Sequence, residues 1–372
     1  MRKNLLITGG AGFIGSHLAD AMLAQGHRVR LLDSMHPQVH GAGARRPPYL
    51  DAEVELVVGD VRDAEVVRNA LAGIDAVFHL AAAVGVGQSM YEIAGYTSIN
   101  NLGTAVLLEA LIKRPVERLV VASSMSIYGE GLYRDARGAL VTAAERGLDQ
   151  LARRDWELRD SAGEELSPVP TPETKPPSLA SVYALSKFDQ ERMCLMIGRA
   201  YRIPTVALRF FNVFGTRQAL SNPYTGVLAI FASRMLNRKP PVIFEDGLQQ
   251  RDFVSVADVA QACMLALDAP SAHGRVFNIG SGRAYTIREI ATRLGKVLGR
   301  ADLEPEVTGK YRVGDIRHCF ADITAAKREL GYAPAVGLDE GLAELASWLE
   351  GQAALDRVGE ARQELAARGL TV

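Results

Sequence analysis

The sequence has few cysteines, and these lie far apart. Cys194, Cys263 and Cys319 are the only three among 372 residues, and they lack the spacing of a metal site. A sparse, odd number of cysteines argues against a disulfide framework. We therefore predict no bound metal and a reducing, cytoplasmic location.

The sequence also lacks a net charge and a long apolar run. Its 42 basic and 43 acidic residues leave a net charge of -1, so no overall field favours nucleic acid or an anionic membrane as partner. No uncharged apolar stretch reaches the roughly 18 residues that span a bilayer. The first apolar stretch follows Arg2 and Lys3 but is soon interrupted by glycines, which predicts a strand rather than a signal peptide. We expect a globular protein with a small-molecule partner.

Short apolar runs alternate with longer amphipathic ones through the first half of the chain. Strands are predicted at 4–7, 28–33, 54–58, 76–80 and 119–123, and helices between them at 15–25, 63–72 and 98–111. Parallel neighbours need helical crossovers, so this alternation predicts an α/β fold with a doubly wound, Rossmann-like parallel sheet.

Three glycines follow the first predicted strand. Gly9, Gly12 and Gly15 stand three positions apart and lead into a predicted helix. Glycine suits this turn because the backbone angles are unusual and a pyrophosphate must approach bare backbone at the helix N-terminus. In this strand-to-helix context the motif predicts a dinucleotide site.

Two aspartates end neighbouring predicted strands. Asp33 ends the second strand, where a carboxylate accepts hydrogen bonds from the adenosine ribose and repels a 2'-phosphate, which favours NAD over NADP. Asp60 follows the third strand, where it could accept from the adenine amino group. A plain turn residue is the alternative reading of each.

The composition divides the chain into three parts. We predict an NAD-binding Rossmann domain at 1–215, with a surface insertion at about 131–177 that is either a lid, an inert excursion or an oligomer contact. A smaller α/β substrate-binding domain is predicted at 216–350. The residues at 351–372 read as a helical tail without visible chemistry.

A tyrosine and a lysine stand one helical turn apart. Tyr183 and Lys187 can therefore face the same cleft, and the lysine cation favours the phenolate, which would make Tyr183 a base near neutral pH. Such a pair often arises by chance on a helix surface. Ser123 and Ser124, however, follow an apolar strand and so lie at the sheet edge where ligands bind in such folds.

Together these motifs resemble the extended short-chain dehydrogenase/reductase family, specifically its NAD-dependent nucleotide-sugar epimerases and dehydratases. The resemblance covers Lys3 to about Trp348. Its motifs occur in family order at 9–15, 59–60, 79–82, 100–104, 123–129, 183–187 and 209–215.

The resemblance implies a role for each matching residue. Ser124 would be the hydroxyl partner, Tyr183 the acid/base, and Lys187 the ligand of the nicotinamide ribose that lowers the tyrosine pKa. His79 is interpreted as a core residue without chemistry. The residues predicted to contact NAD are Gly9, Gly12, Phe13, Ile14, Gly15, Asp33, Asp60, Val61, Leu80, Ala81, Ala82, Asn100, Ser123, Tyr183 and Lys187.

The resemblance also implies a site for the sugar nucleotide. Asn212, Arg251 and Arg312 would bind the diphosphate, which arginine forks suit well, although structural salt bridges are the alternative. Val242 and Phe244 would contact the base. Asp315 would bind the ribose, and Gln88, Ser89 and Ser126 are candidates for the sugar pocket.

The residues after Ser124 bear on the reaction. Dehydratases of this family have an acidic pair there and decarboxylases a glutamate, whereas this chain has Met125 and Ser126. The resemblance therefore favours an epimerase, in which bound NAD oxidises a UDP- or dTDP-sugar, most often at C4, and returns hydride to the other face. Segments 218–227 and 243–247 are similar to a branch that includes dTDP-L-rhamnose 4-epimerases.

Other readings stay open. A dehydratase or a decarboxylase of the same family would share the first oxidation of the sugar by NAD. A ketoreductase would keep Ser124, Tyr183 and Lys187 but exchange NAD(H) with solution, and a noncatalytic NAD-binding scaffold would retain the glycine loop yet tolerate loss of these three residues. Members of the family often form homodimers through two helices of each subunit, which residues 100–113 and 181–201 could supply.

Overall fold

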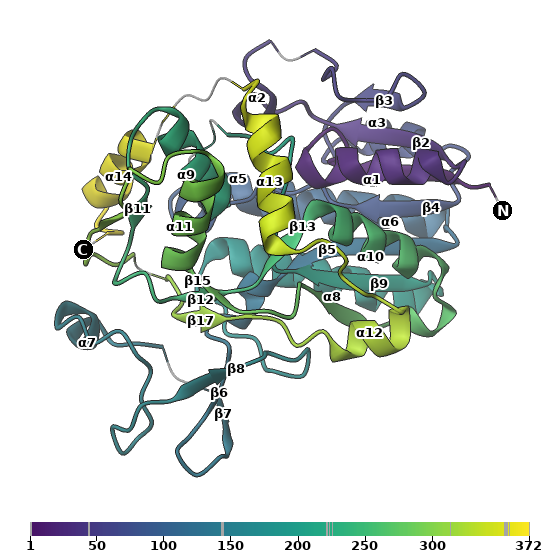
Figure 1. Cartoon of the computed structure of the whole chain (residues 1–372). Coiled ribbons are helices and arrows are strands. Elements are labelled where there is room, and N and C mark those ends of the chain that lie inside the picture. The colour runs from purple at the N-terminus through teal and green to yellow at the C-terminus, as the bar shows by residue number, and fades with distance from the viewer. Residues whose placement is uncertain are drawn as a thin grey trace.

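A seven-stranded sheet forms the centre of the computed structural model (Figure 1), which describes residues 2–43, 45–142, 145–220, 222, 224, 226–312, 314–352, 356 and 358–371. All of its neighbouring strands pair in parallel, in the order β14-β9-β5-β4-β1-β2-β3. This arrangement confirms the predicted Rossmann-like fold. The strands are β1 (Asn4–Thr8), β2 (Arg28–Asp33), β3 (Glu55–Val58), β4 (Ala76–His79), β5 (Arg118–Ser124), β9 (Thr205–Phe210) and β14 (Val276–Ile279).

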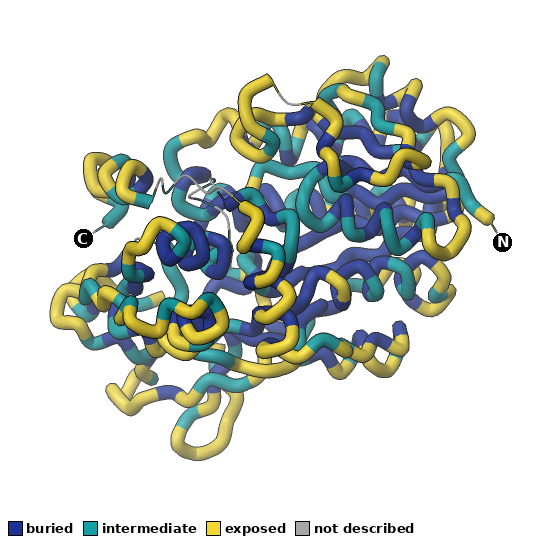
Figure 2. Tube along the Cα trace, turned by 45° about the horizontal axis from the view of Figure 1, so that its top comes forward, coloured by how far each residue is buried: buried dark blue, intermediate teal, exposed yellow. Residues whose placement is uncertain are grey.

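Helices cover both faces of this sheet because successive strand residues point to opposite sides. On β1, Leu5 and Ile7 join one buried cluster with helices α1, α10 and α12, while Leu6 joins another with α3, α6 and α8. Figure 2 shows the buried residues concentrated along the central strands. These helices are α1 (Phe13–Ala24), α3 (Ala64–Ala70), α6 (Gly103–Lys113), α8 (Val182–Tyr201), α10 (Val256–Asp268) and α12 (Thr324–Leu330).

Short elements occupy the loops at the carboxyl ends of the strands. Helix α2 (Pro37–His40) follows β2, and a short 3-10 helix (Met125–Tyr128) follows β5. The connection from β4 to α6 contains α4 (Val86–Ser89), α5 (Ile93–Tyr96) and a π-helical segment (Thr97–Leu102). These loops lie where ligands bind in such folds.

The predicted substrate-binding domain has its own core, in which Phe214 and Phe231 pack with Leu294 and Leu342. Its helices are α9 (Val227–Leu236), α11 (Ile287–Val297) and α13 (Leu338–Leu349). Its small sheets pair β10 (Asn212–Phe214) with β13 (Phe253–Ser255), β11 (Val242–Ile243) with β16 (Glu306–Val307), and β12 (Gln250–Arg251) with both β15 (Tyr285–Thr286) and β17 (His318–Cys319).

The two domains are interleaved in sequence. Helix α10 packs against α1, and β14 pairs with β9 at the edge of the large sheet. Both elements follow residue 215, where the sequence predicted the end of the Rossmann domain. The large sheet therefore draws on residues from both sides of that position.

The predicted surface insertion at about 131–177 contains a small antiparallel sheet. The sheet has the order β7-β6-β8 and projects away from the main body (Figure 1). Tyr133, Leu158 and Leu166 form a separate small core beneath it. Its elements are β6 (Leu132–Arg134), β7 (Leu140–Thr142), α7 (Leu148–Ala152) and β8 (Ser167–Val169).

The predicted C-terminal helix is present as α14 (Val358–Ala367). It lies beside the substrate-binding domain in Figure 1. None of the helices in the described part of the chain combines the length and apolarity needed to cross a membrane.

Candidate active site

One large cavity lies between the carboxyl ends of the central strands and the substrate-binding domain. Its volume is about 900 Å³. The residues that line it include Gly9 after β1, Asp33 at the end of β2 and Ser124 at the end of β5, as well as Phe244 and Arg312 of the second domain. The cavity therefore joins the two predicted binding regions into one site.

Nearly all residues predicted to contact NAD line this cavity. They are Gly9, Gly12, Phe13, Ile14, Gly15, Asp33, Asp60, Val61, Leu80, Ala81, Ala82, Ser123, Tyr183 and Lys187. Asn100 is different because it is fully buried and does not line the cavity. Its amide instead bonds both backbone groups of Ala83 and donates to Ser186 Oγ at 2.8 Å. Asn100 thus holds a cavity-lining loop in place from behind.

The glycine turn fits a dinucleotide. Gly9 has φ +68°, and a Cβ there would lie 2.9 Å from the Ala81 backbone. A Cβ on Gly15 would lie 2.6 Å from Gly10 Cα. The N-cap of α1, Gly12, provides no side-chain acceptor, so the first N–H groups of this helix are available to a pyrophosphate.

Both aspartates are held at the cavity. Asp33 is buried, and its carboxylate accepts from the backbone N–H groups of Ala11 at 3.0 Å and Met35 at 2.9 Å. Asp60 is partly exposed and accepts from Arg62 Nε at 2.9 Å. This hydrogen bond lowers the pKa of Asp60, against the effect of burial. Each aspartate is therefore a fixed acceptor at the adenosine end of the predicted NAD site.

The catalytic candidates meet at the start of α8. Tyr183 and Ser124 both line the cavity, and hydrogen bonding with Ser124 lowers the pKa of the Tyr183 phenol. Ser124 Oγ donates to Ser126 Oγ at 3.1 Å and accepts from the backbone N–H of Ser126 at 3.1 Å. Ser89 Oγ accepts from the backbone N–H of Tyr183 at 3.0 Å. Ser89 is fully buried and does not line the cavity, unlike Gln88 and Ser126. It orients the first turn of α8 instead of lining the predicted sugar pocket.

Burial controls the pKa values at this centre. It raises the pKa of Tyr183, and the hydrogen bond with Ser124 partly opposes the rise. Burial also lowers the pKa of Lys187 to about 8. Lys187 Nζ donates to Gln190 Oε1 at 2.7 Å, which fixes the ammonium group near the cavity. His79 has its pKa lowered to about 3 by burial and is a neutral core residue, as interpreted.

A polar network that the sequence did not predict surrounds Gln88. Gln38 Nε2, from α2, donates to Gln88 Oε1 at 2.9 Å and to Asn222 Oδ1 at 3.1 Å. Tyr96 also donates to Gln88 Oε1, at 3.2 Å, and Gln88 Nε2 donates to Glu92 at 3.0 Å. No local motif marks Gln38, because its partners are distant in sequence.

The predicted nucleotide end lies in the second domain. The Arg312 guanidinium stacks 4.7 Å from the centre of the Phe244 ring and pairs with Asp315 at 2.8 Å. Arg251 donates to the backbone carbonyls of Ile316 at 2.5 Å and of Arg317 at 2.8 Å, which fixes its guanidinium. Val242, Phe244, Arg251, Arg312 and Asp315 all line the cavity.

Asn212 also lines the cavity. Its buried Oδ1 has no hydrogen-bond partner among the described residues. A buried polar atom without a partner is costly unless a ligand or water completes it. This atom therefore fits a residue that binds a ligand.

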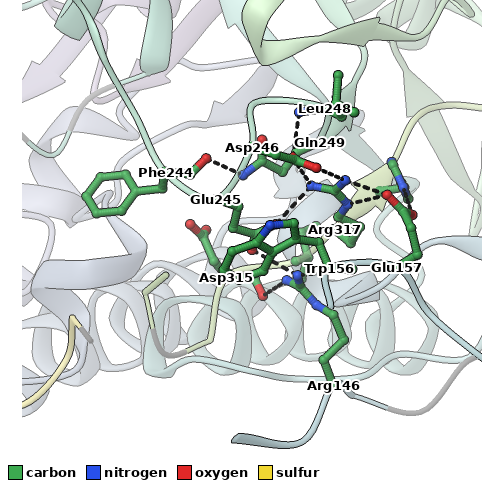
Figure 3. Close-up of polar contacts among 12 residues, drawn as sticks. Arg146, Trp156, Glu157, Phe244, Glu245, Asp246, Leu248, Gln249, Asp315 and Arg317 are labelled. Carbon is green, nitrogen blue, oxygen red and sulfur yellow. Dashed lines mark hydrogen bonds and ion pairs between the residues drawn. The ribbon is translucent and has the colours of Figure 1, made fainter. Parts of the chain in front are cut away.

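A buried ion cluster supports the nucleotide end from outside (Figure 3). Arg146, from the insertion, pairs with Glu245 at 2.9 Å and donates to the backbone carbonyl of Asp315 at 3.3 Å. Glu245 and Asp315 flank the aromatic stack of Phe244 and Arg312. No described residue of the insertion lines the cavity, so it supports the site rather than covering it.

The C-terminal tail contributes to the cavity, which the sequence analysis did not predict. Helix α14 and the residues after it place five side chains there: Val358, Ala361, Arg362, Leu365 and Leu370. The spacing of Val358, Ala361 and Leu365 along one helix face was the available signal. Without the fold, however, that pattern does not tell which surface the helix covers.

Comparisons with known proteins agree with this geometry. The model of the NAD dependent epimerase/dehydratase family matches residues 5–146 and 160–280. A dTDP-L-rhamnose 4-epimerase from Burkholderia thailandensis is 37% identical over 93% of this chain and 95% of its own.

Two solved structures are also similar. The UDP-glucose 4-epimerase of Thermotoga maritima, solved with UDP-glucose, has a TM-score of 0.76 and 32% identity over 93% of this chain and 98% of its own. The UDP-glucose 4-epimerase of Thermus thermophilus, in complex with NAD, has a TM-score of 0.73 and 31% identity over 94% and 100%.

The chain therefore belongs to the NAD dependent epimerase/dehydratase family. NAD is its cofactor. The predicted family, fold and cofactor are confirmed, as is the prediction of an enzyme of the epimerase type.

Proposed function

We propose that this enzyme interconverts the C4 epimers of a UDP- or dTDP-sugar. The observation that carries the proposal is the contact between Tyr183 and Ser124 inside a cavity that extends to the Phe244 and Arg312 stack. Met125 and Ser126, which follow Ser124 in the cavity wall, supply no carboxylate for dehydration or decarboxylation. Relatives named as 4-epimerases support the same choice.

The proposed roles follow from position and charge. Bound NAD would supply the oxidant for the sugar carbinol and the reductant for the resulting ketone. Tyr183 would take the hydroxyl proton and later return it, while Ser124 hydrogen-bonds the same oxygen. Burial raises the pKa of Tyr183, so its phenolate needs the Ser124 hydrogen bond and the nearby Lys187 cation for stabilisation.

The binding roles divide the cavity between its two ends. The glycine turn, Asp33 and the neighbouring strand ends would hold NAD. Asn212, Arg251 and Arg312 would hold the diphosphate, with Phe244 and Val242 at the base. Asn100 and Ser89 position the walls of the cavity without facing it.

The test is turnover of a panel of UDP- and dTDP-sugars in deuterated buffer without added cofactor, followed by NMR. We expect a C4 epimer that carries no deuterium at C4, because hydride leaves and returns within the site. A keto sugar, a dehydrated or decarboxylated product, or turnover only with added NAD or NADH would instead support one of the alternative reactions and refute the epimerase.

We also propose that the enzyme is a homodimer. Exposed apolar side chains gather on neighbouring helices: Ile93 on α5, Leu102 at the end of the π-helical segment, and Leu185 and Met196 on α8. Pairing these helices with those of a second copy would bury the patch. Light scattering should give twice the chain mass for the wild type and for Leu140→Glu, an exposed control elsewhere, but the monomer mass for Leu102→Glu.

A cytoplasmic location is proposed as well. Its support is that all three cysteines are free and buried, which suits a reducing compartment. Fractionation of cells that express the tagged protein tests this location, and recovery in an extracytoplasmic fraction would contradict it.

A further inference from the structure

The C-terminal residues 356 and 358–371, here called the C-terminal strap, are fastened at both ends. Asp356 accepts a hydrogen bond from Lys239 Nζ at 2.8 Å and lies 3.7 Å from Arg234 Nη1 at the end of α9. At the other end, Thr371 forms an antiparallel bridge with Arg312. The strap thus begins and ends on the substrate-binding domain, beyond the part of the chain that the family resemblance covers.

Between these ends, the strap contacts the other side of the cavity. Leu365 is buried, and its methyl groups lie about 3.4 Å from where a Cβ on Gly87 would stand. Arg368 stacks over the Tyr91 ring at 4.4 Å. Tyr91 in turn hydrogen-bonds the hydroxyl of Tyr224 at 2.5 Å. These contacts join the strap to the segment around Gln88, which the family resemblance makes a candidate for the sugar pocket.

Three of the four α14 side chains that line the cavity are apolar, and the fourth, Arg362, lies 3.8 Å from the Glu306 carboxylate. Ala361 and Leu365 are buried and line the cavity, whereas Glu360 and Gln363 are exposed. On either side of Gly87 in the sequence, Val86 and Met90 also line the cavity. This periodicity is typical of a helix that buries one face, and here part of that face borders the cavity.

The side chain of Gln88, the polar residue after Gly87, already has hydrogen-bond partners within the protein. Gln88 Oε1 accepts from Gln38 and Tyr96, and Gln88 Nε2 donates to Glu92. Gln88, which follows Gly87, is therefore not free to bind a sugar hydroxyl at Leu365, and burial of an unpaired hydroxyl is unfavourable. A methyl group of the sugar at Leu365 would need no hydrogen-bond partner and would lose none on binding.

We propose that the C-terminal strap is the wall that selects the sugar, and that it favours a nucleotide-linked 6-deoxyhexose. The inference rests on the proposed epimerase function. Of the two ring carbons beside C4, C3 carries a hydroxyl, and only the group on C5 can be a methyl. Leu365 and Ala361 are then specificity-determining residues that contact this methyl group.

The experiment compares binding and turnover of dTDP-L-rhamnose, a 6-deoxy sugar, with dTDP-glucose, which keeps the 6-hydroxyl. The variants are Leu365→Ala, a chain that ends at Gly351, and Gln363→Ala as the control on the exposed face of the same helix. Calorimetry with dTDP alone checks that the nucleotide end of Leu365→Ala is intact. Circular dichroism checks the fold of each variant.

We expect the wild type and Gln363→Ala to prefer the 6-deoxy sugar by tenfold or more, the range of one small group in an apolar pocket. Leu365→Ala should reduce that preference several-fold, and the shortened chain should lose it. If both variants keep the wild-type preference, or if the wild type has none, the inference is wrong.

Binding and turnover separate the two proposals. If the preference exists in binding and depends on Leu365 while no epimer forms, the epimerase proposal fails and the role of the strap stands. If epimers form equally from both sugars in every variant, the epimerase stands and the strap proposal fails. If no nucleotide sugar binds the wild type, both fail.

Discussion

Glu157 joins the insertion to the predicted substrate-binding domain. Its replacement by glutamine tests how much this contact contributes to the free energy of unfolding. Its carboxylate accepts from Arg317 Nε at 3.0 Å and lies 2.9 Å from His318 Nε2. Arg317 is fully buried and also pairs with Asp246 and Glu245 (Figure 3). Glutamine keeps the volume of the side chain but removes the charge that faces Arg317, so the variant leaves this cation less well compensated.

The size of the effect follows from the pKa of Glu157. Burial would raise this pKa, but the hydrogen bonds from His318 and Arg317 outweigh burial and lower it from 4.5 to about 2. At about 1.4 kcal/mol for each pKa unit, the ionised carboxylate stabilises the fold by roughly 3 kcal/mol. Because the folded pKa is the lower one, this stability is present above pH 4.5 and is lost as the pH falls toward 2.

Urea denaturation followed by circular dichroism measures the effect. At pH 7, Glu157→Gln should unfold with a free energy roughly 3 kcal/mol below that of the wild type, and the difference should shrink as the pH falls below 4.5. Glu164→Gln, an exposed control in the same insertion, should match the wild type. Equal stability of Glu157→Gln and wild type at pH 7, or a difference that does not change with pH, would refute the reasoning.

Three further variants test the site. Tyr183→Phe should lower kcat by about 10²- to 10⁴-fold in the NMR assay with an unchanged fold, since it removes only the acid/base hydroxyl. Arg312→Lys keeps the charge but loses the stack on Phe244, so KM for the nucleotide sugar should rise about three- to thirtyfold with little change in kcat. Gly15→Ala would force a Cβ against Gly10 backbone, so the purified protein should carry less NAD, as measured by absorbance after denaturation.

The sheet and the NAD end of the cavity were predictable because their signals are local. The alternation of strands and helices predicts parallel strands, and Gly9, Gly12 and Gly15 mark their turn by their spacing between a predicted strand and a predicted helix. Strand β14 was not predicted, because it pairs with β9 across a long intervening segment that reads as a separate domain. Pairing between strands distant in sequence leaves no periodic trace in either one.

Motifs single out the candidate catalytic residues, but they do not reveal the surroundings of these residues in the fold. Asn100 and Ser89 stand at family motif positions, yet their side chains face backbone groups behind the cavity. The pKa of Tyr183 depends on how deeply the folded chain buries it, which spacing does not reveal. Leu365 required the fold, since only tertiary packing brings the C-terminal strap to Gly87.

The last strand of the large sheet, β14, follows β9 only after a long intervening segment, and this order has a consequence for synthesis on the ribosome. Strand β9 (Thr205–Phe210) is buried along its whole length, but its outer neighbour β14 ends only at Ile279. At translation rates of about 5 to 20 residues per second, the roughly 70 intervening residues take about 4 to 14 s to emerge. During that interval β9 would present an unpaired apolar edge, the kind of surface that aggregates or recruits chaperones. The nascent chain is therefore expected to be most prone to aggregation after β9 has emerged and before β14 pairs with it.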